Sequence, residues 1–378
     1  MSAPRAYLDW NATTPVLPAA IAAVSEALAL TGNPSSIHAE GRAARALMEA
    51  ARKDIARLVQ ASPENVFFTS GATEGINSIL TLGLCATCGL DRAQTTRVLA
   101  SATEHSAIFA AAPEAGIIPV DSNGILDLAA LEATLAEGGP ALVAVQLANN
   151  ETGVIQPIAE VARLVHAAGG ALMVDAVQAP GKMAVDIGAL GADVLIITAH
   201  KFGGPKGIGA MVFANGETRL ERAFIRGGGQ ERGQRQGTEN LSGIAGFAAA
   251  ARTAAEVDFD AMRTLRDRFE AGLRQLSNGV FIAGEAAPRL PNTSFFALPG
   301  LEAGKVVIAS DLDGVAVSSG SACSSGKVGA SKVLTAMGLG ERAPKGAVRV
   351  SLGPRTTQGE LDACLSTLSR QLARNNKA

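Results

Sequence analysis

PIAEVARLVHAAGGALMVDA, at residues 157–176, contains the pattern that decides the fold. Its first part is typical of a helix and closes on Gly169 and Gly170, a pair that stops helices. ALMVDA follows at once, and its nearly continuous apolar character marks a strand that is buried on both faces. A helix that leads directly into a buried strand is the repeating unit of a parallel sheet.

Similar units lie on both sides of this stretch. A further helical segment, GRAARALMEAARKDIARLVQ, lies at residues 41–60. The other apolar runs are NVFFTS at 65–70, RVLAS at 97–101, ALVAVQL at 141–147, VLIIT at 194–198 and AMVFA at 210–214. This alternation predicts an α/β fold with a mainly parallel central sheet that helices cover on both faces.

The pattern changes after about Asn240. A long helical stretch at 241–276 is followed by weaker alternating strands, NTSFFAL at 292–298 and GAVRVSLG at 346–353, and by a final helix at 359–375. We expect a smaller α+β domain here. The predicted division is a large domain at 15–255 and a small domain made of 1–14 and 256–378.

Composition limits the classes of partner. The chain has 378 residues, is 47% hydrophobic and carries a net charge of −2, so nothing favours binding to a nucleic acid or a membrane surface. It shows neither a signal-peptide run nor about 18 consecutive apolar residues, which predicts a cytoplasmic protein. Four cysteines are too few for a disulfide framework, so we expect free thiols at Cys85, Cys88, Cys323 and Cys364.

Polar residues that follow the apolar runs are the candidates for a binding site, because ligands of α/β sheets bind beyond the carboxyl ends of the strands. These residues are Gly71, Ala72, Thr73, His105, Asn149, Asn150, Asp175, Gln178, His200 and Lys201. GATEG would open a helix whose free N–H groups suit a phosphate. Asp175 would need a charged or protonated partner at the end of a buried strand.

Taken singly, several of these residues have ordinary structural explanations. GATEG could be a simple helix start, His105 a helix cap, and Asn149 and Asn150 turn formers. Together they supply an amine, a carboxylate, an imidazole and a phosphate cup. That combination predicts a pyridoxal 5'-phosphate site, with no metal.

Ordered motifs along nearly the whole chain resemble those of the cysteine desulfurases, in group I of the class V aminotransferase family, which includes the nitrogenase-associated and iron–sulfur-cluster housekeeping enzymes. The motifs are YLDWNATTP, GNPSSIHAEGRAA, FTSGATEGIN, ATEHSAI, NNETGVIQPI, DAVQAPGK, TAHKFGGPKGIG, GGGQERGQRQGTEN, SSGSACSSG and VRVSLG. The resemblance implies fold type I of the pyridoxal phosphate enzymes and a homodimer in which both subunits line each site.

The resemblance also implies roles for individual residues. Lys201 would bind the cofactor covalently, Asp175 would pair with its pyridinium nitrogen, and His105 would stack on its ring. Asn150 would reach the phenolic oxygen, with Gln178 beside it. The phosphate would be held by Ala72, Thr73, Thr198 and His200, joined by Thr238 of the other subunit. Thr198 keeps the hydroxyl where the family commonly has serine.

For the substrate, the resemblance implies that Arg349 pairs with the carboxylate of L-cysteine and that Asn33 lies in the substrate pocket. Cys323 resembles the nucleophile that takes sulfur as a persulfide and passes it to a protein acceptor such as an iron–sulfur scaffold. Its loop, at about 318–330, consists largely of serine and glycine, and we expect it to be mobile.

The remaining cysteines have simpler explanations. Cys85 and Cys88 form a C-x-x-C pair at what the sequence suggests is a helix end, where core packing is favoured over redox or metal chemistry; Cys364 should lie in the core. After the nucleophile, SSGKVGASKVL departs from the acidic residue and proline of many relatives. Lys327 and Lys332 could therefore alter which acceptor docks.

Three alternatives stay open at this stage. A selenocysteine lyase, or a relative acting on cystine or cysteine sulfinate, would share the fold, because release of selenium does not strictly need Cys323. A transaminase of the same fold would leave an exposed cysteine without a purpose. A scaffold without chemistry would have lost Lys201, Asp175 or Cys323, and all three are present.

Overall fold

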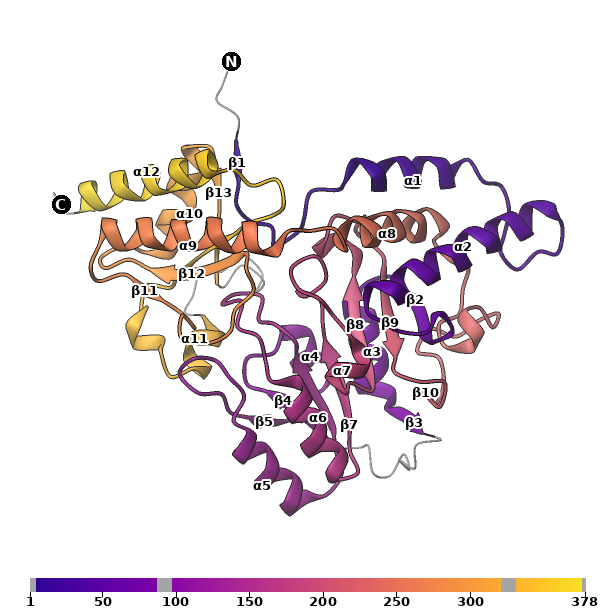
Figure 1. Ribbon diagram of the computed structural model, residues 1–378. Helices are drawn as coiled ribbons and strands as arrows, with labels where there is room; N and C mark the ends of the chain where they lie inside the picture. The colour runs from indigo at the N-terminus through magenta and orange to yellow at the C-terminus, as the bar shows by residue number, and fades with distance from the viewer. Residues whose placement is uncertain (1–4, 87–96, 321–330, 376–378) are drawn as a thin grey trace.

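The computed structural model describes residues 5–86, 97–320 and 331–375. Two sheets, each with its own helices, lie side by side in it (Figure 1). Among the described helices, none is both long and apolar enough to cross a membrane.

The larger sheet has seven strands in the order β2-β9-β8-β7-β6-β4-β5. All neighbours pair in parallel except β9, which is antiparallel to β2 and to β8. The bounds are β2 (Val66–Thr69), β4 (Val98–Ser101), β5 (Gly116–Ile118), β6 (Leu142–Gln146), β7 (Ala171–Asp175), β8 (Val194–Thr198) and β9 (Gly209–Phe213). The predicted α/β fold with a mainly parallel sheet is confirmed.

Helices cover both faces of this sheet. One face packs against α2 (Ala39–Leu58), α5 (Leu128–Gly138), α6 (Ile158–Ala167), α7 (Ile187–Leu190) and α8 (Leu241–Ala254). The other face packs against α3 (Ala72–Leu82) and α4 (Ser106–Ala111). Side chains alternate between the two cores, because successive residues of a strand point to opposite faces. In β7, for example, Leu172 and Val174 enter the first core and Met173 the second.

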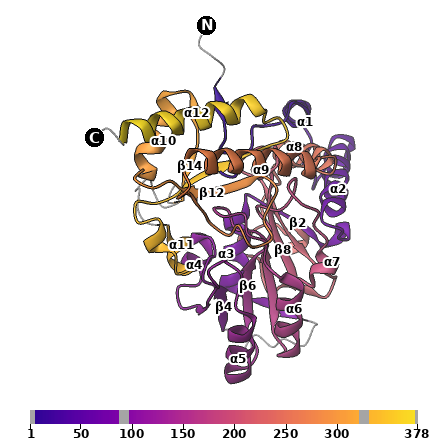
Figure 2. The same cartoon turned by 60° about the vertical axis from the view of Figure 1, so that its left-hand side comes forward.

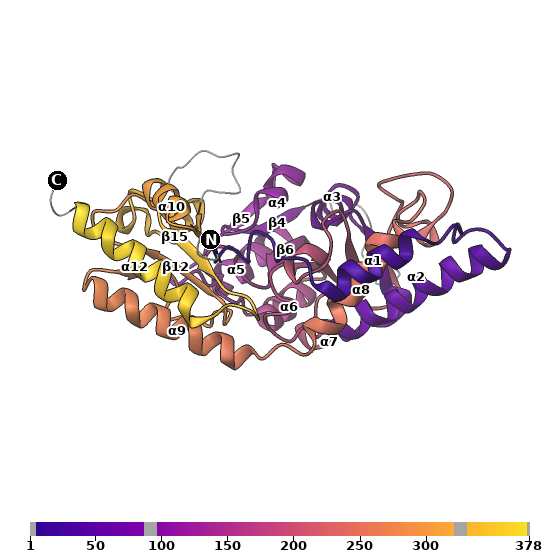
Figure 3. The same cartoon turned by 90° about the horizontal axis from the view of Figure 1, so that it is seen from above.

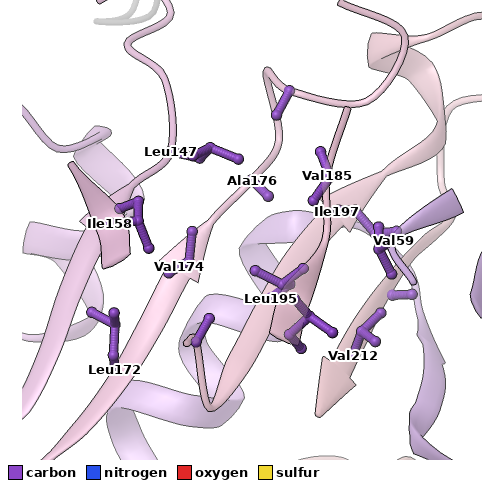
Figure 4. Packing of buried hydrophobic residues seen from close by; sticks show 14 of the residues in the cluster. Val59, Leu147, Ile158, Leu172, Val174, Ala176, Val185, Leu195, Ile197 and Val212 are labelled. Carbon is purple, nitrogen blue, oxygen red and sulfur yellow. The ribbon is translucent and has the colours of Figure 1, made fainter. Parts of the chain in front are cut away.

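Figure 4 shows part of the first core. Leu172 and Val174 of β7, Leu195 and Ile197 of β8 and Val212 of β9 lie against apolar side chains that the helices and loops supply. All five side chains are fully buried. Burying a side chain of this kind contributes roughly 1.5–3 kcal/mol, so this layer holds the strand ends, and the polar residues that follow them, in fixed positions.

The smaller sheet has four antiparallel strands in the order β11-β12-β15-β14. Its strands are β11 (Phe281–Ile282), β12 (Thr293–Ala297), β14 (Ser318–Ser319) and β15 (Val348–Ser351). One face carries α9 (Phe259–Leu276), α10 (Ala303–Leu312) and α12 (Gln358–Asn375), and the other carries α11 (Lys332–Ala336). Figures 2 and 3 show α9 and α12 side by side above this sheet.

The segment that we expected to be one long helical stretch forms two helices, α8 and α9. Helix α8 packs on α1 (Pro18–Leu28) and α2, whereas α9 packs on α12 and β12. The break occurs because Asp258 caps α9: its Oδ1 accepts hydrogen bonds from Asp260 N (3.0 Å) and Ala261 N (2.9 Å). This packing supports our proposal of a domain boundary near residue 255.

The N-terminal segment packs with the smaller sheet. Strand β1 (Ala6–Tyr7) pairs in parallel with β13 (Val315–Ala316), and Asp9 forms a bridge with Ser351. This pairing supports the proposed assignment of residues 1–14 to the small domain.

Two local expectations differ from the structure. Cys85 lies in a short strand, β3 (Leu84–Ala86), that pairs with β10 (Thr218–Leu220), because Gly83 ends α3 with φ of 74° and the chain then turns. Cys88 lies outside the described residues. The loop expected from about 318 begins later, since Ser318 and Ser319 pair with β15. Cys364 of α12 is buried in the hydrophobic core beside the smaller sheet, as expected.

A buried ion pair anchors the segment that leads to Thr238. Arg52 of α2 donates from Nη1 and Nη2 to the two carboxylate oxygens of Glu231 (2.9 and 2.6 Å), which also accepts a hydrogen bond from Phe68 N (2.8 Å). Glu231 and Arg232 both adopt positive φ (47° and 53°), a conformation that non-glycine residues hold only when their surroundings impose it.

We expect Glu231→Ala to lower the free energy of unfolding by about 3 kcal/mol, because the buried Arg52 guanidinium loses the carboxylate that pairs with both its Nη atoms and keeps the Glu49 carboxylate at Nε. Glu285→Ala, which removes an exposed partner of Arg274, should cost less than about 1 kcal/mol. Urea unfolding followed by circular dichroism measures both variants. Equal losses would contradict the importance of the buried pair.

Candidate active site

A cavity of about 650 Å³ lies at the carboxyl ends of the parallel strands of the larger sheet. It is lined by nine of the residues predicted for the cofactor: Ala72, Thr73, His105, Asn150, Asp175, Gln178, Thr198, His200 and Lys201. These residues come together because they follow β2, β4, β6, β7 and β8 or end those strands, and these strands end at one edge of the sheet.

One end of the cavity suits an anion. Helix α3 starts at Ala72, and no side chain caps its N-terminus, so its first N–H groups face the cavity. Thr73 adds a hydroxyl. Across the cavity, Thr198 is buried and donates from Oγ1 to Ile208 O (3.1 Å). The positive end of the helix and the Thr73 hydroxyl favour a phosphate group.

His200 completes this end. Its Nδ1 lies 3.2 Å from Thr13 Oγ1. Burial lowers the pKa of His200 to about 4, with the nearby lysines Lys201, Lys206 and Lys182 adding to the effect. The imidazole is therefore neutral at pH 7 and acts by hydrogen bonding.

The opposite part of the cavity holds a buried carboxylate. Asp175 ends β7, and its Oδ1 accepts a hydrogen bond from Val177 N (3.0 Å). Burial raises the pKa of Asp175, while the hydrogen bond from Val177 N and the charge of Lys201 oppose that rise. A carboxylate in such a place is stabilised by a cationic partner, as a protonated ring nitrogen would be.

His105 both caps a helix and lines the cavity. Its Nδ1 accepts a hydrogen bond from Ala107 N (3.2 Å) at the start of α4, which places the proton of the neutral ring on Nε2. Burial lowers the pKa of His105, so the ring is neutral at pH 7. The structural explanation of His105 as a cap is therefore true, and it is compatible with a role in the cavity.

Lys201 lies in η2 (Ala199–Lys201), directly after β8. Its Nζ donates hydrogen bonds to the main-chain oxygens of Asn11 (2.8 Å) and Ala12 (3.1 Å). The same oxygen of Asn11 accepts a hydrogen bond from Gln178 Nε2 (3.1 Å). An N-terminal segment that our sequence analysis did not assign to the site therefore holds two of its residues.

Three predicted site residues do not line the cavity. Arg349 is buried in β15 and donates to Asn150 O (2.9 Å) and Asp9 Oδ1 (2.7 Å), while its Nε has no partner among the described residues. Asn33 is exposed on the segment before α2. Thr238, expected to serve the other subunit, lines a separate cavity of about 180 Å³. Their roles remain proposals.

Asn149, the neighbour of Asn150, also lies outside the cavity. Its Oδ1 accepts hydrogen bonds from Glu151 N and Thr152 N (2.8 Å each). Its explanation as a turn former is therefore correct.

Sequence reasoning missed two buried acids near the site. Glu104 precedes His105; burial and then the negative charge of Asp175 raise its pKa well above the ordinary range. Glu151 follows Asn150, and its Oε2 accepts a hydrogen bond from Ser331 Oγ (2.7 Å). The motifs TEH and NNE contain both acids, but composition gives no sign that either is buried.

Glu151 also lies against the two residues that flank the segment carrying Cys323. Cys323 itself lies outside the described residues. Ser331 follows that segment, and Gly320 precedes it. A Cβ atom on Gly320 would lie 2.5 Å from Glu151 Oε2. Burial raises the pKa of Glu151 to about 7, although the Ser331 hydrogen bond and the charge of Arg349 oppose the rise.

This shift predicts a pH-dependent stability difference between the protein and its Glu151→Gln variant. The folded protein holds the Glu151 proton up to about pH 7, whereas the unfolded chain loses it near 4.5, so ionisation costs stability as pH rises through this window. We expect wild type to lose about 3 kcal/mol relative to the variant between pH 4.5 and 7.5. Denaturant unfolding at several pH values measures the difference, and parallel stability curves would contradict the prediction.

The residues of the cavity fit pyridoxal 5'-phosphate. A helix N-terminus with the Thr73 hydroxyl suits its phosphate, a buried carboxylate suits its ring nitrogen, and a lysine amine lines the same cavity, which is large enough for the ring. Lys201, Asp175 and His105 would hold the ring, and Ala72, Thr73, Thr198 and His200 would hold the phosphate.

Comparison with protein families gives a match to one model, described as "Aminotransferase class-V", over residues 6–364. The chain is 41% identical over 375 residues to a protein named "Cysteine desulfurase" from Cereibacter sphaeroides, covering 96% of this chain and 95% of that relative. It is 38% identical over 376 residues to a protein of the same name from Sinorhizobium fredii, covering 96% and 95%.

Solved structures show the same similarity in three dimensions. The structure of a NifS-like protein from Rickettsia africae matches with a TM-score of 0.87 at 32% identity, and the match covers 98% of this chain and 99% of that one. The similarity therefore includes both sheets.

Proposed function

The chain belongs to the class V aminotransferase family, and on that premise we propose that it is a pyridoxal phosphate-dependent cysteine desulfurase that converts L-cysteine to L-alanine. The observation that carries the proposal is the single cavity in which Lys201, Asp175 and His105 meet beside an anion-binding helix terminus. Relatives that match over almost their whole length carry the name cysteine desulfurase, which favours this activity over the others of the fold.

When bound, pyridoxal phosphate supplies an electron sink for bonds at the α-carbon of an amino acid. Asp175 would stabilise positive charge at the ring nitrogen, because a buried carboxylate interacts strongly with an adjacent cation. His105 would contact the ring as a neutral imidazole. Lys201 supplies the amine that binds the cofactor, and the oxygens of Asn11 and Ala12 accept hydrogen bonds from that amine.

We assign Arg349 to the substrate carboxylate, and Asn33 to the substrate pocket. Arg349 is buried, and its Nη1 donates a hydrogen bond to the main-chain oxygen of Asn150 (2.9 Å), a residue that lines the cavity. Its unpaired buried Nε gives it a donor that a carboxylate would satisfy.

Cys323 is the proposed nucleophile. Its thiolate attacks the sulfur of the substrate, an S–S bond forms, and the C–S bond breaks with its electrons going to carbon, which takes up a proton to give L-alanine. The sulfur is then a persulfide on Cys323, ready for a protein acceptor such as an iron–sulfur scaffold or for a thiolation pathway. Lys332 lies at the start of α11, close to this segment in sequence, and could take part in docking of the acceptor.

We propose that the active form is a cytoplasmic homodimer with Thr238 reaching the phosphate of the other subunit. Exposed apolar side chains support an interface at the end of the molecule where α1 and α2 lie (Figure 1). They belong to α1, the segment after it and the segment before η3 (Glu231–Gly233): Ile21, Leu28, Leu30, Ile37, Phe224 and Ile225.

An anaerobic single turnover of the purified protein with L-cysteine tests the proposal. We expect one alanine per site, together with a mass increase of one sulfur on the peptide that contains Cys323. A cofactor-loaded protein that gives neither product with L-cysteine, but releases selenium from L-selenocysteine, would instead establish the lyase alternative.

A further inference from the structure

Asn11 lies where the two sheets meet, and it is 1% exposed. All four hydrogen-bonding positions of its side chain are occupied. Oδ1 accepts from Lys182 Nζ (3.0 Å) and Asn292 Nδ2 (3.0 Å), and Nδ2 donates to Asn150 O (3.2 Å) and Thr293 Oγ1 (2.9 Å). A primary amide can make no more than these two donor and two acceptor pairs with one partner each.

The partners of this side chain come from both parts of the molecule. Lys182 and Asn150 follow strands of the larger sheet, whereas Asn292 and Thr293 belong to the start of β12 in the smaller one. Asn292 and Thr293 are 0% exposed and bond to each other, Thr293 Oγ1 donating to Asn292 Oδ1 (2.8 Å). One amide therefore connects the two sheets through a buried network with every member paired, which is the arrangement that specifies a unique geometry.

The main chain of Asn11 makes the connection to the cavity. Its N–H donates to Ser351 Oγ of β15 (3.0 Å). Its carbonyl oxygen accepts from Lys201 Nζ (2.8 Å) and Gln178 Nε2 (3.1 Å). The side chain thus fixes the plane of the peptide whose oxygen holds the lysine amine and the glutamine amide.

Lys182 completes the frame. It is 5% exposed, and its Nζ donates to Asn11 Oδ1 and to Gln178 Oε1. Gln178 is therefore held at both ends of its amide, by Lys182 through Oε1 and by Asn11 O through Nε2. Asn11, Lys182 and Gln178 are therefore linked pairwise by hydrogen bonds, and Asn11 and Gln178 also line the cavity.

We propose that Asn11 is a positioning residue for Lys201 and Gln178: its side chain ties the N-terminal segment to both sheets, and its carbonyl oxygen then holds the two site residues in register with the cavity. This inference rests on the proposed function, since it assumes that Lys201 binds the cofactor. Asn11 would act through Lys201 and Gln178, without contact with the reacting atoms.

The physical reason is that the amide of Asn11 holds the two sheets in one relative position. The amine of Lys201, which donates to the carbonyl oxygen of Asn11, is then held in one position as well. Without its amide, Asn150 O, Thr293 Oγ1, Asn292 Nδ2 and Lys182 Nζ each lose a buried partner. The main chain of Asn11 then keeps only its N–H bond to Ser351 Oγ as a tie to the smaller sheet, so its carbonyl oxygen is less firmly oriented. Thr14 still donates hydrogen bonds from its main-chain N–H to His200 O and from its hydroxyl to Lys201 O, so the N-terminal segment stays near the site. The amine of Lys201 would be held, but less well placed.

The test compares Asn11→Ala and Asn11→Asp with a matched control, Asn65→Ala. Asn65 is also a buried asparagine; its Oδ1 accepts a hydrogen bond from Arg219 Nη2 (3.0 Å), and it lies at the amino end of β2, across the sheet from the cavity. Cofactor is removed from each purified holoprotein, and the rate at which the apoprotein takes up added pyridoxal phosphate is followed by visible absorption. Thermal unfolding of each apoprotein reports the loss of stability.

We expect both Asn11 variants to take up cofactor about 10- to 100-fold more slowly than wild type, because a misplacement of ~1 Å can cost about 100-fold in rate. Their kcat should fall by a similar factor with a much smaller change in KM for L-cysteine. Asn65→Ala should lose stability yet take up cofactor within about twofold of the wild-type rate, since distant sites act independently.

Asn11→Asp guards against failure of the alanine variant to fold, because it keeps the side-chain volume and the acceptor for Lys182 and Asn292, while it replaces the two donors to Asn150 O and Thr293 Oγ1 by a carboxylate oxygen. Wild-type uptake rates in the folded Asn11 variants, or an equal slowing in Asn65→Ala, would overturn the proposal. Cofactor uptake needs no substrate. A wild-type protein that binds cofactor but does not desulfurate L-cysteine would therefore contradict the proposed function, while the uptake rates of the Asn11 variants would still test the role of Asn11.

Discussion

Lys201→Ala will purify without covalently held cofactor, and its rate of alanine formation from L-cysteine will fall by at least about 1,000-fold. The amine is the group in the cavity that can bind the aldehyde of pyridoxal phosphate covalently and move protons at the substrate, and loss of such a group removes two contributions to catalysis together. Visible absorption of the purified variant, mass spectrometry after borohydride reduction and amino-acid analysis measure the outcome.

Lys206→Ala is the matched control for this prediction. Lys206 also lines the cavity, but it is exposed and lies beyond η2. We expect this variant to keep the covalent cofactor, on the peptide that contains Lys201. Covalent cofactor in Lys201→Ala, or its loss in Lys206→Ala alone, would show that the attachment site is assigned wrongly.

Cys323→Ser should keep the visible absorption of the bound cofactor and still lose sulfur release by at least about 1,000-fold. A serine hydroxyl is a far weaker nucleophile toward sulfur than a thiolate, and a persulfide needs a sulfur atom at this position. The cavity residues are unchanged in this variant, so cofactor and substrate binding should persist. Sulfide and alanine are measured under anaerobic conditions with a limiting amount of L-cysteine.

Cys364→Ala provides the control for Cys323. Cys364 is 1% exposed in α12, and burial raises its pKa to about 12, so its thiol neither ionises nor meets substrate at neutral pH. We expect this variant to carry persulfide on Cys323 at the wild-type level. If Cys323→Ser desulfurated L-cysteine at the normal rate, the nucleophile would have to be another residue.

Several residues of the cavity could be predicted because they are local to strand ends in the sequence. His105, Asp175 and Lys201 each follow or end a buried strand, and parallel strands of one sheet end at one edge. Strand periodicity therefore placed them together without knowledge of any long-range contact. The helix start at Ala72 was equally local, since Gly71 precedes a run with helical spacing.

The residues that support the cavity could not be found in this way. Asn11 contacts Lys201 across 190 positions of the chain and Asn292 across 281. In sequence it is one polar residue in a short N-terminal segment, and no spacing rule connects it to either partner. Glu151 likewise acquires its raised pKa from burial beneath Gly320 and Ser331, which belong to the other sheet's part of the chain.

The sequence by itself determined the order of strands and helices, the mainly parallel sheet and the edge at which the chemistry collects, because backbone periodicity and side-chain alternation are properties of neighbouring residues. Only the tertiary structure decided that Arg349 reaches Asp9 and Asn150, and that Asn11 holds Lys201. These contacts join segments far apart in the chain, and their energies depend on burial, which arises only when the two sheets pack against each other.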